Sequence, residues 1–227
     1  MSADVVSGNF GVISMEFFEQ YKEDMISYVK NRLEEYDATE NPILKIRHSR
    51  FEHTMRVYKW MKKLYAAYPD NEHLDLEVLS IATIFHDVGY CDVENIKNHA
   101  EASAIYCREY LEEKKYSSEK TDFVCDIICR HSSKGLLHED IPGELILLLE
   151  ADLLDDSGAQ GLVLDIWLEA AREKDVSFQS ILEHMEKYTL VMMQNKPMRT
   201  EEGIKTWNEK KMLSEAFVQA YKADILF

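Results

Sequence analysis

Apolar side chains recur at three- to four-residue intervals along most of this chain, and no alternating pattern of the kind that predicts a β-strand persists in it. The first such segment places Phe17, Tyr21, Met25, Tyr28 and Val29 on one helical face. Only 8 glycines and 4 prolines occur among the 227 residues, which is too few to punctuate a chain of many short strands. The sequence therefore predicts an all-α fold, built as a helical bundle.

Turn-forming residues such as Asn41-Pro42 and Pro142-Gly143 divide this pattern into separate helices. We expect helices over residues 16–36, 50–68, 74–85, 98–113, 121–130, 144–156, 162–173, 178–195 and 201–224. The first 14 residues are small and polar, so residues 1–14 are expected to be flexible. Neither a repeat nor a linker interrupts residues 15–227, which predicts a single helical domain whose last helices form an appended layer.

The chain is strongly acidic, with 42 Asp and Glu against 26 Lys and Arg and a formal net charge of −16. Such a field repels phosphate backbones at long range, so we expect no nucleic-acid polymer as a partner. It argues equally against binding to an anionic membrane surface. A small anionic substrate would require a bound cation that inverts the local potential.

The sequence shows neither a targeting segment nor an apolar run long enough to cross a membrane. Four cysteines are present, at Cys91, Cys107, Cys125 and Cys129. Cys125 and Cys129 share a helical face, but no second pair stands at the spacing of a zinc site. We therefore expect free thiols and a reducing, cytoplasmic setting.

Several polar residues occur where burial is costly. His86 and Asp87 follow the apolar run at residues 81–85, and Asp152 lies within the very apolar segment ILLLEADLLDD. A carboxylate in such surroundings is destabilising unless it is paired or bound to a cation. These positions therefore predict a buried cation.

His53 is expected to point into the same interior, because Val57, Met61 and Leu64 follow it at helical spacing. Two imidazoles and two carboxylates would then form a mixed nitrogen–oxygen site. Such a ligand set suits Mn²⁺, Fe²⁺, Co²⁺, Ni²⁺ or Mg²⁺, and it leaves coordination positions open for water and substrate. Together the four side chains predict a divalent metal site.

This pattern resembles the HD-domain superfamily of metal-dependent phosphohydrolases. In that family a His is followed along the chain by a His-Asp doublet and then by a distant Asp. The same order is found here in the segments FEHTMRV, IFHDVGY and EADLLDDSGAQG, which contain His53, His86-Asp87 and Asp152. The flanking residues also match, at Arg56, Gly89 and Gly158-Ala159. The resemblance covers about residues 45–165 and is specific as a set.

The resemblance implies a helical bundle of the HD-domain type in which His53, His86, Asp87 and Asp152 hold a metal ion. Similar proteins cleave phosphoester or phosphoanhydride bonds. The substrate implied is a small phosphorylated metabolite, such as a nucleotide. The metal would lower the pKa of a bound water and polarise a phosphoryl oxygen.

Two further histidines, His99 and His131, stand where related proteins carry either ligands of a second metal or substrate-facing histidines. With two metals, the resemblance also includes di-iron oxygenases. One metal is favoured over two. In that case His99 and His131 would contact phosphate or donate a proton to the leaving group, for which an imidazole is suited.

Three other side chains each have two interpretations. Arg56, three residues after His53 on the same helical face, would clamp a phosphoryl oxygen or pair with a neighbouring carboxylate. Asp92 would transfer a proton or serve only as a loop carboxylate. Asp156 would orient a metal ligand or cap its helix. Lys97 and Arg130 are the other cations nearest the motifs.

A third interpretation of the chain is a non-catalytic binding or sensory module that keeps the fold. An intact set of four ligands disfavours it, because such a module would not require all of them. The remaining histidines stand in polar sequence and are expected at the surface: His48, His73, His138 and His184. The residues do not select one substrate, one metal or an oligomeric state.

Overall fold

The computed structural model describes residues 15–39, 49–92, 98–172, 175–195 and 197–225. Within these ranges the chain forms helices and their connections and contains no strand, which confirms the all-α prediction. Segment 1–14, His48 and Lys97 lie outside the described residues. None of the described helices is both long enough and apolar enough to cross a bilayer.

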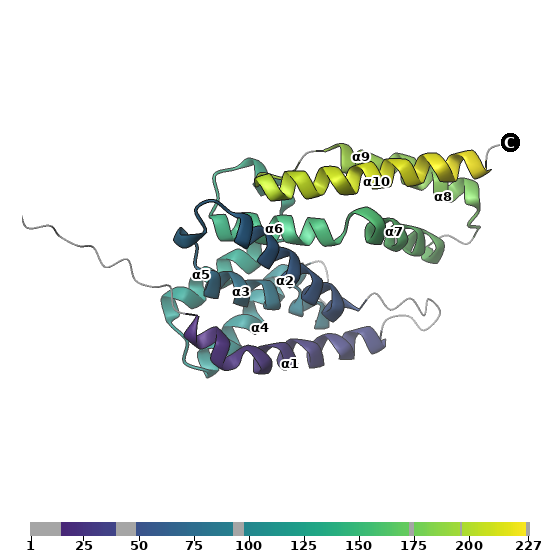
Figure 1. The fold of residues 1–227 in the computed structure, drawn as a ribbon. Helices are drawn as coiled ribbons and strands as arrows, with labels where there is room; N and C mark the ends of the chain where they lie inside the picture. The colour runs from purple at the N-terminus through teal and green to yellow at the C-terminus, as the bar shows by residue number, and fades with distance from the viewer. Residues whose placement is uncertain (1–14, 40–48, 93–97, 173–174, 196, 226–227) are drawn as a thin grey trace, which may run out of the picture.

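The helices begin and end close to the expected positions (Figure 1). In chain order they are α1 (Glu16–Thr39), α2 (Arg50–Ala67), α3 (Leu76–Phe85), α4 (His99–Glu113), α5 (Ser118–Arg130), α6 (Gly143–Asp155), α7 (Gly158–Arg172), α8 (Phe178–His184), α9 (Leu190–Gln194) and α10 (Glu201–Ile225). Short 3-10 turns lie between some of them: η1 (Asn71–His73), η2 (Val88–Cys91) and η4 (Lys134–His138). Side chains fix several helix starts, since Ser49 and Asp75 accept backbone hydrogen bonds at the beginning of α2 and α3.

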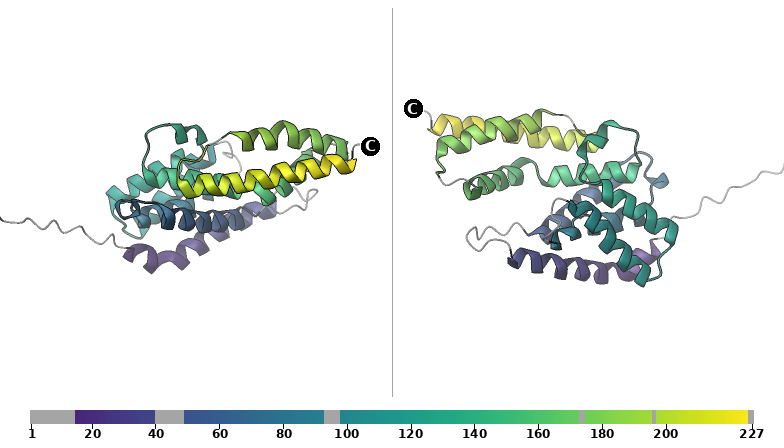
Figure 2. Two further views of the ribbon diagram at one scale, coloured as in Figure 1. Left: turned by 45° about the horizontal axis from the view of Figure 1, so that its top comes forward. Right: turned by 180° about the vertical axis from the view of Figure 1, so that it is seen from behind.

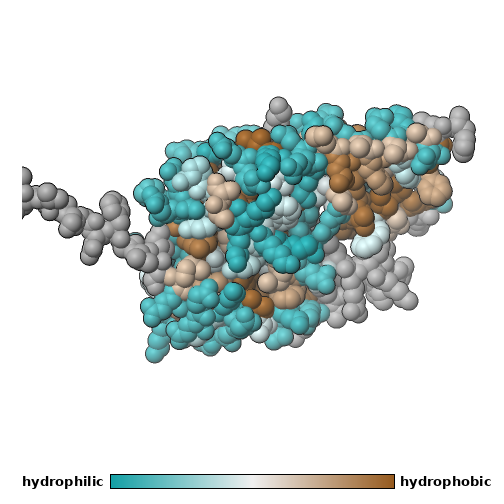
Figure 3. All heavy atoms as spheres, in the orientation of Figure 1, coloured by the Kyte–Doolittle hydropathy of each residue, from teal (hydrophilic) through white to brown (hydrophobic). Residues whose placement is uncertain are grey.

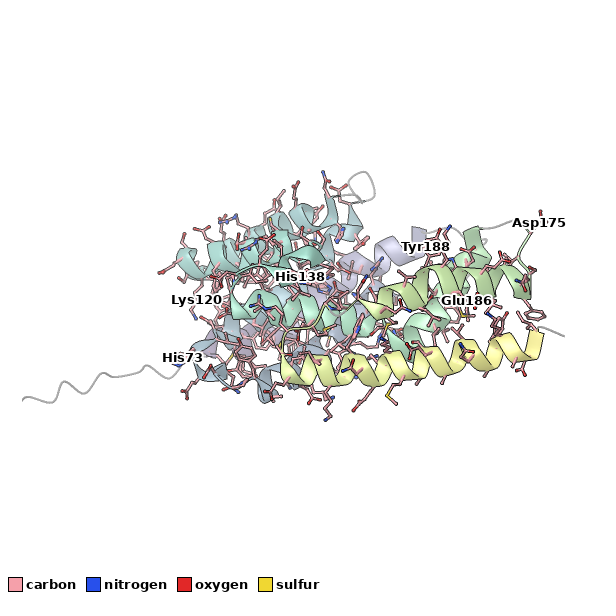
Figure 4. The ribbon with its side chains drawn as sticks, turned by 90° about the horizontal axis from the view of Figure 1, so that it is seen from above. His73, Lys120, His138, Asp175, Glu186 and Tyr188 are labelled. Carbon is pink, nitrogen blue, oxygen red and sulfur yellow. The ribbon has the colours of Figure 1, made fainter. Side chains whose placement is uncertain are left out.

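The expected helix over residues 178–195 runs without a break from 178 to 194, but its hydrogen-bonding pattern changes in the middle. A π-helical turn, η5 (Met185–Thr189), separates α8 from α9. Glu186 and Tyr188 belong to this turn (Figure 4). The Thr189 hydroxyl in the turn donates a hydrogen bond to Asp165 in α7. The irregular turn is thus tied to a neighbouring helix by a polar contact that apolar periodicity does not encode.

The helices α3 and α6 lie in the interior of the bundle, with α1 on one side and α10 on the other (Figure 1). Nine of the ten residues of α3 and eleven of the thirteen residues of α6 are buried. Each fully buried Leu or Ile contributes about 1.5–3 kcal/mol relative to an exposed one, so these two helices are firmly fixed in the core. Polar side chains at their carboxyl ends are therefore forced inside with them.

The last four helices extend beyond the rest of the bundle (Figures 1 and 2). They enclose a second, smaller apolar cluster made of Leu162, Ile181, Leu182, Met185 and Val218. Figure 3 shows apolar residues reaching the surface over this part of the molecule, whereas polar side chains cover most of the remainder of that face.

Buried Glu150 fastens α10 to the core. Its carboxylate accepts hydrogen bonds from the backbone N–H groups of Arg199 and Thr200 and from the Thr200 hydroxyl. Gly203 makes this approach possible, since a Cβ atom there would lie 2.3 Å from a Glu150 carboxylate oxygen. A carboxylate from α6 thus meets the positive, amino-terminal end of α10.

Candidate metal centre

His53 in α2 and Asp152 in α6 face each other across the packed interface of these two helices. His53 Nε2 lies 3.1 Å from Asp152 Oδ1 and 3.5 Å from Asp87 Oδ2. His53 is 1% exposed and Asp152 is 8% exposed, so both side chains are shielded from bulk water. The inward orientation expected for both residues is what the structure has.

The His86-Asp87 doublet ends α3 inside the core. His86 Nδ1 lies 2.8 Å from the carbonyl oxygen of Thr83, so this nitrogen must donate its hydrogen and Nε2 keeps a lone pair. His86 Nε2 points to the carboxylates, at 3.7 Å from Asp87 Oδ2 and 4.0 Å from Asp152 Oδ1. These distances are too long for hydrogen bonds.

The fit to a metal ion rests on the donor atoms gathered around His86. His86 Nε2 is fully buried and has no hydrogen-bond partner among the described residues. One donor atom each from His53, His86 and Asp152 lie within 4.8 Å of one another. Buried polar groups are normally satisfied, so an unsatisfied imidazole nitrogen that faces two carboxylates indicates a cation site. The donor set suits a divalent ion of the transition series or Mg²⁺.

Two more histidines approach the other oxygen of Asp87. His131 Nε2 lies 3.3 Å and His99 Nε2 lies 3.6 Å from Asp87 Oδ1. His131 Nδ1 is held by the carbonyl of Ile128 at 2.7 Å, and the His99 ring stacks on Tyr90 with 4.3 Å between ring centroids. Donor atoms of His86, Asp87 and His131 form a second group within 4.8 Å. The structure thus brings together all six residues of the expected centre.

The electrostatics of the centre favour a cation. Burial lowers the pKa of His86 to about 4, which keeps its ring neutral. Burial also opposes the charged form of His53, but the carboxylates of Asp152 and Asp155 outweigh it and raise the pKa of His53 to about 10. Burial raises the pKa of Asp87 and Asp152, yet neighbouring cationic groups hold both well below the usual range. Two ionised carboxylates therefore remain in the core.

Asp155 also contacts the centre, although the sequence analysis gave it no role. Asp155 Oδ2 accepts a hydrogen bond from His53 Nδ1 at 2.8 Å, whereas the nearest oxygen of Asp156 is 3.8 Å away. Arg56 holds Asp155 from the other side, with its Nε and Nη2 at 2.9 and 3.0 Å. The carboxylate interpretation of Arg56 is thus the one the geometry favours. The sequence signals for Asp155 were its place in the motif segment EADLLDDSGAQG and in the same apolar helix as Asp152.

Besides Arg56, the cations at the centre are not the ones named from the sequence. Lys134 donates to Asp152 Oδ2, and Arg50 Nη1 lies 3.4 Å from Asp87 Oδ2. Arg130 instead forms an exposed pair with Asp126 at 3.0 Å. Arg50 stands three residues before His53 and Lys134 three after His131, a spacing that could have identified both.

Other expectations have mixed outcomes. Asp92 is half-buried at the end of η2, and its proton-transfer role stays a prediction. His73 and His138 are exposed, as expected, at separate places on the surface (Figure 4). The surface assignment of His184 was wrong, because its half-buried ring lies 3.1 Å from Glu169 and 3.5 Å from Asp165. The sequence of α8 around His184 is polar, but α7 covers it.

A cavity of about 530 Å³ begins next to the centre, at Asp156 and Ser157. It continues between α7 and the η5–α9 segment, where Leu168, Tyr188 and Met192 contribute apolar surface. Its volume is within the range of about 300–1,000 Å³ that accommodates small organic ligands.

A family model of the HD domain matches residues 50–156, which include His53, His86-Asp87 and Asp152 in the family's order. Residues 50–156 are therefore an HD domain. The matched residues are the ones that carry the candidate metal centre. The match confirms the resemblance to the HD-domain superfamily that the motifs indicated. No curated protein matches the sequence.

Solved structures share the fold over nearly the whole chain. A protein from Listeria innocua is 23% identical, with 91% of this chain and 99% of that chain covered and a TM-score of 0.62. An HD-superfamily hydrolase from Bacillus thuringiensis is 20% identical, with 91% and 97% covered and a TM-score of 0.65. YpgQ from Bacillus subtilis, solved in complex with ADP, is 18% identical, with 93% and 97% covered and a TM-score of 0.65. At such low sequence identities, the structural likeness shows the fold alone.

Proposed function

We propose that this HD protein is a metal-dependent phosphohydrolase in which His53, His86, Asp87 and Asp152 hold one divalent ion. The observation that carries the proposal is the buried His86 Nε2, which has no hydrogen-bond partner among the described residues and belongs to a group of donor atoms, with those of His53 and Asp152, that lie within 4.8 Å of one another. Binding of a metal ion is the usual reason why imidazoles and carboxylates gather in a helical core.

The ion, when bound, supplies Lewis acidity that lowers the pKa of a water and polarises a phosphoryl oxygen. The protein contributes the groups around it. His99 and His131, on the far oxygen of Asp87, are placed to contact a phosphoryl oxygen or to protonate the leaving group. Lys134 and Arg50 add two cationic groups that offset the acidity of the chain where a phosphate would bind.

The substrate we infer is a small phosphorylated metabolite, with nucleotides as the first class to test. The structural relative YpgQ was solved with ADP, and the present chain has a largely apolar cavity beginning at Asp156 that could receive a base and sugar. Phosphate groups would then lie toward Lys134 and the metal ligands, with the organic part between α7 and α9.

A second candidate is a two-metal centre of the oxygenase type. It is favoured by the additional donor group formed by His86, Asp87 and His131. Against it, the Lys134 ammonium on Asp152 and the Arg50 guanidinium near Asp87 already provide positive charge beside both carboxylates. One ion is therefore the leading proposal.

The test is a phosphate-release assay on protein stripped of metal and reloaded separately with Mn²⁺, Fe²⁺, Co²⁺, Ni²⁺ or Mg²⁺. The panel contains nucleoside mono-, di- and triphosphates and simple phosphate esters. We expect turnover with at least one ion, and loss of both metal and turnover in His86→Ala. The matched control is His73→Ala, since His73 is exposed and remote from the motifs.

Three outcomes would count against the proposal. Oxygen uptake by the iron-loaded protein, without phosphate release, would favour the oxygenase. A metal-loaded protein that turns over nothing in the panel would favour the non-catalytic module. His86→Ala protein that retains stoichiometric metal would contradict the ligand assignment itself.

A further inference from the structure

A second cavity lies behind His53, on the side opposite to the candidate metal centre. It has a volume of about 420 Å³ and is bounded by side chains of α2, α6, α7 and α10. Asp155, which contacts His53 Nδ1, forms part of its wall, whereas the candidate metal ligands face His53 Nε2. The His53 ring therefore lies between this cavity, on its Nδ1 side, and the candidate metal centre, on its Nε2 side.

Cations dominate the wall of this cavity. Four are present, Arg56, Lys59, Lys63 and Lys210, against the single carboxylate of Asp155. That carboxylate is already engaged by Arg56 and His53. In a chain whose net charge is −16, a concave region with this excess of positive charge is a strong local departure. Clefts lined by one sign of charge concentrate ions of the other sign.

The ammonium groups are held around Trp60, which also lines the cavity. Lys63 Nζ lies 5.3 Å and Lys210 Nζ lies 5.0 Å from the centroid of the Trp60 ring. Lys210 donates to the carbonyl of Ser157 at 2.9 Å, and Lys63 pairs with Glu202 at 2.8 Å. Both cations are thus positioned by groups at the cavity edge.

Hydrogen-bond donors remain available in the cavity. Arg56 uses Nε and Nη2 on Asp155, and its Nη1 has no hydrogen-bond partner within the described part of the chain. Lys59 forms no ion pair with any described residue. Burial lowers the pKa of Lys210, and the like charge of Lys63 adds to this effect while Asp155 opposes it. An anion between these groups would relieve the repulsion.

We propose that this cavity is a binding site for a polyphosphate chain, separate from the metal centre. Guanidinium and ammonium donors spread around one concave surface suit a ligand that carries several phosphate charges in a row. The chain could come from an inorganic polyphosphate or from the phosphate tail of a nucleotide. The proposal does not depend on the proposed function, because no candidate metal ligand takes part in it.

The test is isothermal titration calorimetry of tripolyphosphate into protein dialysed free of metal and chelator. We expect one site per chain. Lys59→Gln should weaken binding about threefold, the effect of losing one exposed ion pair, and Lys59→Gln/Lys210→Gln about tenfold. The matched control is Lys62→Gln/Lys211→Gln, which removes the same charge from the same two helices outside the cavity. Lys59 is exposed, so the single variant keeps the fold.

Several results would overturn this inference. The first is that tripolyphosphate does not bind the wild-type protein. The second is that the control pair weakens its binding as much as Lys59→Gln/Lys210→Gln does. The third is loss of binding in His86→Ala, because that result would place the anion at the metal centre. Retained binding in His86→Ala supports it, whatever the outcome of the hydrolase assay. Comparing ATP with tripolyphosphate identifies the source: equal affinity indicates the chain alone, and tighter ATP binding indicates an added base contact.

Discussion

Replacing Asp155 by asparagine tests whether the carboxylate behind His53 positions a metal ligand. In the structure Asp155 accepts from His53 Nδ1 at 2.8 Å and is held by Arg56 at 2.9 Å. The substitution keeps the shape of the side chain but removes its charge. It therefore weakens the acceptor that fixes the orientation and tautomer of the His53 ring.

The expected loss of metal affinity follows from the chemistry of this contact. Removing a carboxylate that orients a ligating histidine typically costs about 10- to 100-fold in metal affinity, or about 1.4–2.7 kcal/mol. Asp155 also raises the pKa of metal-free His53, which favours proton competition with the metal. Its removal relieves part of that competition, so we expect the lower end of the range near neutral pH.

Stability should fall as well. A hydrogen bond to a charged group contributes about 1.5–3 kcal/mol, and Asp155 makes such contacts with two side chains. Arg56 is partly exposed and can be solvated by water, so we expect a net loss of about 2 kcal/mol for Asp155→Asn. Urea unfolding of the metal-free protein measures this quantity without interference from metal binding.

Metal affinity is measured by competition with a fluorescent chelator. Asp156→Asn is the matched control, since Asp156 is the next residue, is about half exposed and lies 3.8 Å from His53 Nδ1. The reasoning would be refuted by an Asp155→Asn protein that binds metal as tightly as wild type, or by an Asp156→Asn protein with the larger loss.

Three further predictions follow from other contacts. The pKa of His53 is about 10 without metal, so a metal ion must displace a proton from Nε2. The apparent affinity of the protein for the metal should therefore rise with pH, by up to about tenfold per pH unit around neutrality. Calorimetry in two buffers should detect the released proton. A pH-independent affinity would exclude this displacement. Lys134→Gln should reduce kcat/KM about tenfold while metal stoichiometry is kept, if the ammonium that now meets Asp152 binds a phosphate; unchanged kinetics would remove Lys134 from the site. Glu150→Ala leaves two backbone N–H groups at the start of α10 without their acceptor and should cost about 3 kcal/mol, seen as a Tm lower by roughly 10 °C. A Tm within error of wild type would show that α10 does not depend on this anchor.

The sequence by itself determined the helices and the identity of the central residues. Helix periodicity is a local property, so the bounds of α2, α3 and α6 could be placed to within a few residues. The cost of burying charge is equally local: His86-Asp87 and Asp152 stand in segments too apolar to be at the surface. That cost was enough to predict that these residues meet a cation.

Only the tertiary structure decided which neighbours serve the centre. Asp155 and Asp156 follow Asp152 by three and four residues and lie on either side of it around the helix, so periodicity could not choose between them. The rotation of α6 against α2 placed Asp155 on His53 Nδ1. Lys134 comes from a 3-10 segment whose path is set by packing. Such choices depend on angles and distances between helices, which a linear pattern of residues does not contain.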